Sequence, residues 1–228
     1  MRIVFDIIRS LVSWGLLPAL TLMPASSLAQ PENAPSNLIC QEAPRLGWTV
    51  CATTVRLPLT GKKLRDPSID FHPRNVADGD PKTAWAPGQP GLNLGNTLKV
   101  YFGKKRRFRY LSLWNGYSLS AEAWIITGRL REILIQTSDG LYDRARLVER
   151  NGAQVIALSR PVEATWMRVI ALVSRPGEIY WPFAISELSL SNGVRGVGVP
   201  LVIANRVDDW LPEFEEQGDK EGRHRTNK

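Results

Sequence analysis

Residues 77–85 read Ala77-Asp78-Gly79-Asp80-Pro81-Lys82-Thr83-Ala84-Trp85, and they are the stretch that says most about the fold. They place two carboxylates and a hydroxyl beside a tight turn. Hard cations such as calcium bind several oxygens at about 2.3–2.6 Å, and this turn can aim Asp78, the carbonyl of Asp80 and the Thr83 hydroxyl at one point. One turn cannot supply six ligands, so a distant acid is needed. The segment equally fits an Asx-type turn with Trp85 packed beneath it.

On both sides of this segment, short stretches with strand character alternate with glycine or proline turns. The strand candidates are residues 48–56, 98–102, 110–114, 131–137, 144–150, 154–158, 166–173 and 183–190. No window beyond the first 29 residues offers three turns of helical apolar periodicity with caps. Many short strands separated by turns are typical of a sandwich or a barrel, so we predict an all-β fold.

Two polar segments lie between strand candidates. Asn151-Gly152 accepts positive φ at both turn positions, which is the strongest short hairpin signal, and predicts a hairpin between residues 144–150 and 154–158. Lys104-Lys105-Arg106-Arg107 predicts a basic turn between two strands. Its positive potential could attract phosphates, acidic glycans or lipid headgroups, and a solvated hairpin end is the simpler interpretation.

The two ends of the chain differ from the middle. Residues 1–29 carry Arg2 and Arg9, a mostly apolar run from Leu11 to Met23, and Ser27-Leu28-Ala29. This pattern predicts a signal peptide cleaved after Ala29. A retained anchor is the alternative, but the apolar run is shorter than the roughly 20 residues that span a bilayer. We therefore expect an exported bacterial protein, periplasmic or secreted, without a transmembrane anchor after cleavage.

The remaining chain divides by composition. Residues 207–228 are mainly charged and predict a disordered tail, because they cannot bury enough apolar surface to offset the entropy of ordering. Residues 30–65 are interpreted as an N-terminal arm, and residues 66–206 as the β-sandwich domain. The chain has two cysteines, Cys40 and Cys51. In an oxidising compartment this close pair predicts one disulfide in the arm.

The formal net charge of the 228 residues is +7. A basic exported protein can attract anionic polymers or lipid headgroups, although the charge alone is also compatible with plain solubility. No nucleic-acid-binding motif is present, and we expect no nucleic-acid partner.

The order of three separated motifs resembles a known family. Residues 78–85, followed far downstream by Ala184-Ile185-Ser186-Glu187-Leu188, resemble the discoidin superfamily, which includes the coagulation factor 5/8 type C and galactose-binding-like domains. The sequence is closer to the NADase-type glycan-binding domain of bacteria in residues 85–88, in residues 113–117 and in Pro176-Gly177. The resemblance covers roughly residues 75–191.

This resemblance implies a discoidin-like jelly-roll β-sandwich that binds its ligand through loops at one end. It also implies a structural calcium in some members. Carried over by position, the ligands of that calcium would be Asp78, Asp80, Thr83 and Glu187, with carbonyls from Asn75 and Ser186. Glu187 is then the distant acid that the turn alone lacks.

Aromatic side chains provide the candidate ligand site. Loops that bind sugars use flat aromatic faces together with a few polar groups that fix orientation. We predict one cluster around Trp114, Asn115, Tyr117 and Trp124, with Arg129 as a hydrogen-bonding fork. Tyr180 and Trp181 offer a second loop. The alternative is that these aromatic residues pack the inside of the sandwich.

Catalytic motifs are absent from the sequence. The histidines are His72 and His224, and neither belongs to a recognisable nucleophile or metal motif. We therefore predict a non-catalytic binding module for a carbohydrate or another anionic envelope ligand. The alternative is a protein-interaction or scaffold domain in the periplasm, and an enzyme would need a pair of facing carboxylates that sequence spacing cannot reveal.

Overall fold

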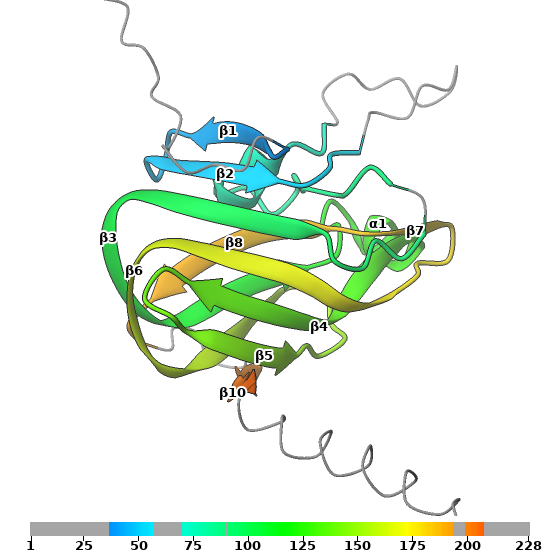
Figure 1. The fold of residues 1–228 in the computed structure, drawn as a ribbon. Coiled ribbons are helices and arrows are strands. Elements are labelled where there is room, and N and C mark those ends of the chain that lie inside the picture. The colour runs from blue at the N-terminus through cyan, green and yellow to red at the C-terminus, as the bar shows by residue number, and fades with distance from the viewer. Residues whose placement is uncertain (1–36, 57–69, 90, 194–198, 208–228) are drawn as a thin grey trace, which may run out of the picture. The chain divides into compact units, whose positions relative to one another are not determined.

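The computed structural model describes residues 37–56, 70–89, 91–193 and 199–207 (Figure 1). The predicted signal peptide lies outside the described residues, as does the tail from residue 208 onward. The strands are β1 (Ile39–Ala43), β2 (Trp48–Ala52), β3 (Thr97–Asn115), β4 (Thr127–Thr137), β5 (Tyr142–Arg146), β6 (Ala153–Arg175), β7 (Tyr180–Phe183), β8 (Ile185–Ser191), β9 (Leu201–Ile203) and β10 (Asn205–Arg206). A 3-10 helix, η1 (Pro73–Ala77), and one short α-helix, α1 (Ala121–Ile126), complete the described elements. Within these ranges no helix is long and apolar enough to cross a membrane.

Two long strands, β3 and β6, build both layers of the sandwich. Residues 97–101 of β3 pair with β2, whereas residues 110–115 pair with β8. The pairing of β3 with β6 is irregular between Tyr101 and Arg106. Both strands turn a corner there, and Figure 1 shows them bending at the same edge with β8 behind. One layer has the order β1-β2-β3-β6-β4-β5-β10, and the other consists of β8, β3, β6 and β9.

The core lies between these layers and confirms the predicted β-sandwich. Buried and more exposed residues alternate along much of β3 and along the second half of β6, as period-two side-chain geometry requires. The rings of Trp48 and Phe108 each meet Phe102 edge to face, with centroids 5.4 and 5.8 Å apart. Trp85, at the end of the 77–85 turn, is 1% exposed and packs edge to face on Phe183. That turn is therefore anchored in the core.

The first two strands extend the same sheet. β2 pairs with β3, and Val50 and Ala52 contribute to the main core. The sheet thus begins at Ile39, inside the segment interpreted from sequence as an arm. Cys40 and Cys51 are register partners on β1 and β2 and form a disulfide, as predicted.

Two turn predictions were wrong. Asn151-Gly152 does not close a hairpin, because β5 pairs with β4 and β10, and residues 147–150 carry the chain from one layer to the other. The basic residues 104–107 are not a turn between two strands. They lie within continuous β3 at the corner of the sandwich. Local sequence signals mark a change of direction in both places, but they do not distinguish a hairpin from a passage between layers.

Candidate functional site

Asn115, Trp124 and Arg129, three of the predicted ligand residues, lie where β3, α1 and β4 meet. Asn115 is the last residue of β3 and is 1% exposed. Its side-chain amide donates to the carbonyl of Leu130 at 2.7 Å, and its side-chain oxygen accepts from the Leu130 N–H at 2.9 Å. Asn115 thereby ties the end of β3 to β4. Both polar groups of its side chain are used by the protein.

Arg129 closes the other side of this junction. One guanidinium nitrogen donates to the carbonyls of Trp124, Ile125 and Thr127, at 2.7, 3.3 and 2.8 Å. These carbonyls lie at the C-terminal end of α1, where helical carbonyls lack intrahelical partners. The guanidinium also stacks on the Trp124 ring, 4.3 Å from its centroid. The Trp124 indole N–H in turn donates to the carbonyl of Asn115 at 2.8 Å.

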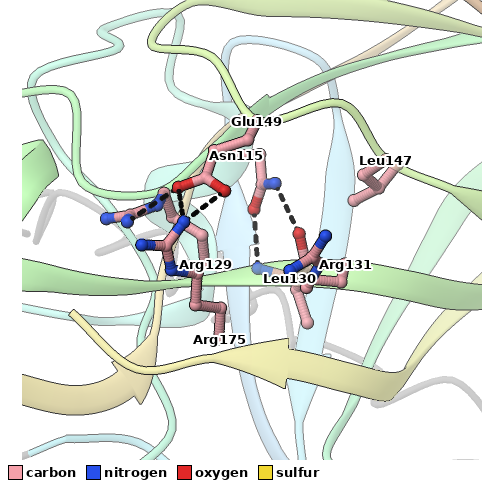
Figure 2. A pocket seen from close by; sticks show the side chains of 7 residues that line it. All are labelled: Asn115, Arg129, Leu130, Arg131, Leu147, Glu149 and Arg175. Carbon is pink, nitrogen blue, oxygen red and sulfur yellow. Dashed lines mark hydrogen bonds and ion pairs between the residues drawn. The ribbon is translucent and has the colours of Figure 1, made fainter.

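An ion-pair group extends this junction to the surface. Glu149 accepts from Arg129 at 3.1 Å and from Arg175 at 2.6 Å. Burial alone would raise the pKa of Glu149, but hydrogen bonds from these two arginines outweigh it and hold that pKa below its usual value. Figure 2 shows Glu149 between the two guanidinium groups and the Asn115 amide directed at Leu130. We call Asn115, Trp124, Arg129 and Glu149 the Arg129 cluster. They line or adjoin a pocket whose polar groups are mostly paired with one another.

A second arginine at the same end has a different environment. The Arg56 guanidinium lies over the ring of Tyr180 at 4.5 Å and over the ring of Phe71 at 5.2 Å from the centroids. Phe71 meets Tyr117 edge to face at 5.5 Å. We call Arg56, Phe71, Tyr117 and Tyr180 the Arg56 cluster. Phe71 is buried and the other three side chains are half-buried.

The guanidinium donors of Arg56 have no partner in the described part of the chain. Its backbone N–H donates to the carbonyl of Ala86 at 2.8 Å, but its guanidinium makes no hydrogen bond or ion pair within the described residues. Burial lowers the pKa of Arg56, and Tyr180 offsets part of that effect. A guanidinium carries five N–H donors in a planar fork. This cluster therefore combines aromatic faces with unsatisfied donors.

The remaining predicted ligand residues do not join one surface. Tyr117 and Tyr180 belong to the Arg56 cluster. Trp114 is half-buried and, by strand alternation, lies on the side of β3 opposite Asn115. Trp181 belongs to β7, and its side chain lies outside the described part of the structure.

Part of the predicted calcium set does converge. The Thr83 hydroxyl oxygen lies 2.8 Å from a carboxylate oxygen of Asp78, 2.9 Å from the carbonyl of Asp80 and 3.3 Å from the carbonyl of Asn75. Glu187 reaches the same turn and accepts from the Gly79 N–H at 3.1 Å. One hydroxyl proton serves three acceptors here, and oxygen atoms crowd together as they do around a hard cation.

The 77–85 turn also concentrates negative charge around Glu187. Burial, followed by the nearby charge of Asp78, raises the pKa of Glu187 to about 7. Arg45, which donates to the carbonyl of Asp78 at 3.0 Å, partly offsets the negative charge. The carboxylate of Asp80 instead accepts from the Lys82 N–H, so Asp80 offers its carbonyl to the group. No three His, Cys, Asp or Glu side chains converge within the described ranges, so carbonyl and hydroxyl oxygens must supply most ligands. With that condition, the residues present fit calcium.

Sequence reasoning missed Arg56, Phe71, Glu149 and Arg175. Arg56 was only the last residue of a strand candidate, and Phe71 lies far from Tyr117 and Tyr180 in the chain. No local motif joins these residues, since the strand order alone brings them together.

Comparisons with known proteins agree with this architecture. The family model for the NAD glycohydrolase translocation F5/8 type C domain matches residues 51–191. A comparison with curated protein sequences found no match.

Solved structures similar to this chain include two modules from Clostridium perfringens. One is CpGH89CBM32-5 in complex with GalNAc-β-1,3-galactose, with 12% identity, a TM-score of 0.48, and coverage of 63% of this chain and 94% of that chain. The other is the family 32 CBM of NanJ in complex with galactose, with 20% identity, a TM-score of 0.44, and coverage of 63% and 92%. A pectin-binding carbohydrate-binding module has 16% identity, a TM-score of 0.44, and coverage of 68% and 94%.

Proposed function

The chain belongs to the NAD glycohydrolase translocation F5/8 type C domain family, and on this premise we propose that it is a non-catalytic carbohydrate-binding module whose ligand contacts the Arg56 cluster. The single observation behind the proposal is the half-buried Arg56 guanidinium, which lies over the rings of Tyr180 and Phe71 and has no acceptor among the described residues. A half-buried guanidinium presents several N–H donors in a planar fork, and these remain available to a ligand. A ligand rich in hydroxyl oxygens supplies the missing acceptors.

The same cluster suits a sugar in its apolar surfaces. Binding sites for small polar ligands combine aromatic walls with a few convergent polar groups. Tyr180 contributes a half-buried ring beside the Arg56 fork. The C–H face of a sugar ring would pack on the tyrosine while its hydroxyls accept from the guanidinium. We expect weak affinity for each site, because only one stacking surface and one fork are involved.

A glycan array followed by calorimetric titration tests this proposal. The full protein should bind a subset of glycans, and Arg56→Leu should lower the affinity for the best glycan at least about tenfold, because charge-assisted hydrogen bonds are lost. The matched control is Arg146→Leu, which removes one exposed cation elsewhere and should leave affinity unchanged. If the protein binds no glycan but captures a defined protein partner through the Arg56 cluster, the carbohydrate hypothesis is wrong. The protein would then be a protein-interaction or scaffold domain.

We also propose that the 77–85 turn and Glu187 bind a structural calcium. Asp78, Thr83 and Glu187 would provide side-chain oxygens, and Asn75 and Asp80 would provide carbonyls. When bound, the cation would neutralise the carboxylates that now repel each other. It would fix the turn that carries Trp85 into the core, so its role would be to hold the fold and not to contact the ligand.

Thermal unfolding with calcium or with EDTA tests the cation site. A ligand that binds only the folded state must raise the midpoint. The midpoint of the wild-type protein should rise with calcium, and this rise should vanish in Glu187→Ala. Thr83→Val would be a milder second variant that keeps the shape of the side chain. An equal rise in all three proteins would disprove the site.

Export remains part of the proposal. Residues 1–29 carry the signal pattern, and the Cys40–Cys51 disulfide suits an oxidising compartment. Expression of the full chain in a bacterial host, followed by fractionation and N-terminal sequencing, should find a product in the periplasm or medium that starts at Gln30. An uncleaved cytoplasmic product would disprove export.

A further inference from the structure

A line of cations follows β3 around the corner of the sandwich. Along this strand Val100, Phe102 and Phe108 are buried, so the residues between them face outward. Lys99 lies before the first irregularity, Lys104 and Lys105 lie within it, and Arg107 and Arg109 follow it; the last four are exposed. From Lys99 to Arg109 the path is about 33 Å at roughly 3.3 Å per residue. This line is separate from the loop end that carries the Arg56 cluster.

Little negative charge opposes these cations. Residues 157–164 of β6 face this part of β3, and Glu163 is the one carboxylate among them. Its oxygen lies 4.0 Å from the Lys105 ammonium, and both side chains are 63% exposed, so the pair is weak. Lys104, Arg107 and Arg109 have no ion pair within the described residues. The corner therefore carries a strong, largely unbalanced positive potential.

The first cation of the line is held in place by aromatic rings. The Lys99 ammonium lies 4.6 Å from the ring centroid of Tyr101 and 4.3 Å from that of Trp166. It has no carboxylate partner within the described ranges. The Lys99 ammonium therefore covers a face of each of the two rings. Nucleic-acid strands bind through stacking of bases on open aromatic faces, and this surface offers none beside Lys99.

The shape of the strand decides between a polymer and a bilayer. Lys99 lies in the layer where β3 pairs with β2, whereas Arg109 adjoins the part that pairs with β8. The cations are thus spread around a bend (Figure 1). A flat membrane can touch only those on one side of the bend. A flexible chain of negative charges can follow the strand and contact all of them.

We propose that the outward side of β3 from Lys99 to Arg109 binds a linear acidic polysaccharide, a chain that bears carboxylate or sulfate groups. Binding is electrostatic and runs along the strand. It therefore weakens with salt and requires several charges on one polymer. The surface acts independently of the Arg56 cluster, so the protein contacts envelope material at two places.

Binding of the full protein to polygalacturonate tests this proposal, with dextran as the neutral polymer. The wild-type protein should bind polygalacturonate at low salt and lose affinity as the salt concentration rises. It should not bind dextran. Lys105→Gln/Arg107→Gln should lower the affinity roughly tenfold through the loss of two contacts. The control variant Lys82→Gln/Arg146→Gln removes the same net charge at positions outside β3. It should change the affinity for polygalacturonate less than twofold. Arg56→Leu should leave polygalacturonate binding intact, which separates this surface from the proposed sugar site.

Three results would overturn the proposal. Equal losses in the two double variants would show a net-charge effect without a defined surface. Tighter binding to phosphatidylserine vesicles or to a single-stranded oligonucleotide, lost in the β3 variant, would assign the corner to a membrane or a nucleic acid. Absence of polygalacturonate binding at low salt would remove the polysaccharide. Unfolding midpoints of both variants should stay close to wild type, because the substituted side chains are exposed and Glu132, which loses Arg146 in the control, still pairs with Arg144.

Discussion

Two arginines at the same end of the sandwich stack on aromatic rings, yet they differ in what their donors do. In the Arg129 cluster the guanidinium serves the last carbonyls of α1 and the Glu149 carboxylate. In the Arg56 cluster the guanidinium lies over Tyr180 and Phe71 and has no acceptor within the described residues. In the Arg129 cluster one guanidinium nitrogen, Nε, is left without a partner, but it is buried, whereas the Arg56 guanidinium is half-buried and can be reached by a ligand.

The difference separates structural from functional polar groups. A buried donor that is fully paired contributes to stability, and removing it leaves its partners without bonds. A half-buried donor that lacks a protein acceptor among the described residues stays available to a ligand. The Arg129 cluster thus holds the loop end together, and the Arg56 cluster is the place where the loop end meets its ligand.

The largest expected effect is on stability, from Arg129→Leu. The Arg129 side chain is 8% exposed. Its removal leaves three backbone carbonyls without this donor, and Glu149 keeps only Arg175 as a partner. We expect the free energy of unfolding to fall by about 3 kcal/mol, measured by denaturant titration. The folded fraction should keep its glycan affinity within about twofold. Unchanged stability with lost binding would reverse the roles given to the two clusters.

Asn115→Leu should give the second largest loss of stability, after Arg129→Leu. Leucine has a similar volume but cannot replace the two hydrogen bonds to the backbone of Leu130, and these backbone groups are buried. The expected loss is about 2 kcal/mol of unfolding free energy. Asn115→Asp is the informative comparison, because it keeps the acceptor for the Leu130 N–H and loses the donor to the carbonyl. A loss confined to glycan binding would instead place Asn115 in the ligand site.

A smaller effect is expected from Tyr180 on binding. Tyr180→Ala removes a stacking face and frees the Arg56 side chain, which should lower glycan affinity about fivefold, or roughly 1 kcal/mol. Tyr180→Phe keeps the ring and should retain most of the affinity. Calorimetric titration of the three proteins distinguishes the ring from the hydroxyl. Equal losses in both variants would assign the contact to the hydroxyl.

The smallest expected effect is a pH dependence from Glu187. The pKa of its carboxyl is about 7 in the folded protein, against an ordinary value of 4.5. The folded state therefore binds the proton more tightly than the unfolded state does. Without calcium, the contribution of Glu187 to stability is present below about pH 4.5 and is lost as the pH rises towards 7. Glu187→Gln should lack this decline in unfolding experiments in EDTA.

The matching control is the same titration with calcium. Calcium favours the ionised carboxylate of Glu187. With calcium, the fall in the stability of the wild-type protein between pH 4.5 and 7 should therefore shrink or reverse. Identical pH profiles of wild type and Glu187→Gln, with and without calcium, would show that this turn is held by hydrogen bonds alone.

The sequence predicted the features that local chemistry controls. Alternating short strands, the 77–85 turn and the Cys40–Cys51 pair were sufficient for the β-sandwich, the anchored Trp85 and the disulfide. The convergence of Glu187 on that turn came from the family resemblance. It could not come from spacing, because more than a hundred residues separate the two.

The candidate site was less predictable for a physical reason. Arg56, Phe71, Tyr117 and Tyr180 come from four separate segments, and only the pairing of strands brings them together. Conversely, Asn115 and Arg129 have the polarity of ligand residues, but the backbone groups that they satisfy are invisible in sequence. The turn predictions for Asn151-Gly152 and for residues 104–107 were wrong for a related reason. The same residue types occur in hairpin turns and where the chain passes from one layer of the sandwich to the other.

The most direct test of the account is chemical denaturation of Arg56→Leu beside a glycan titration of the same protein. The unfolding free energy of Arg56→Leu should lie within about 1 kcal/mol of wild type, because the half-buried guanidinium makes no hydrogen bond or ion pair among the described residues. The account also predicts at least a roughly tenfold loss of glycan affinity. A variant that loses stability as Arg129→Leu does, while its folded fraction binds glycan normally, would contradict the assignment of Arg56 to the ligand.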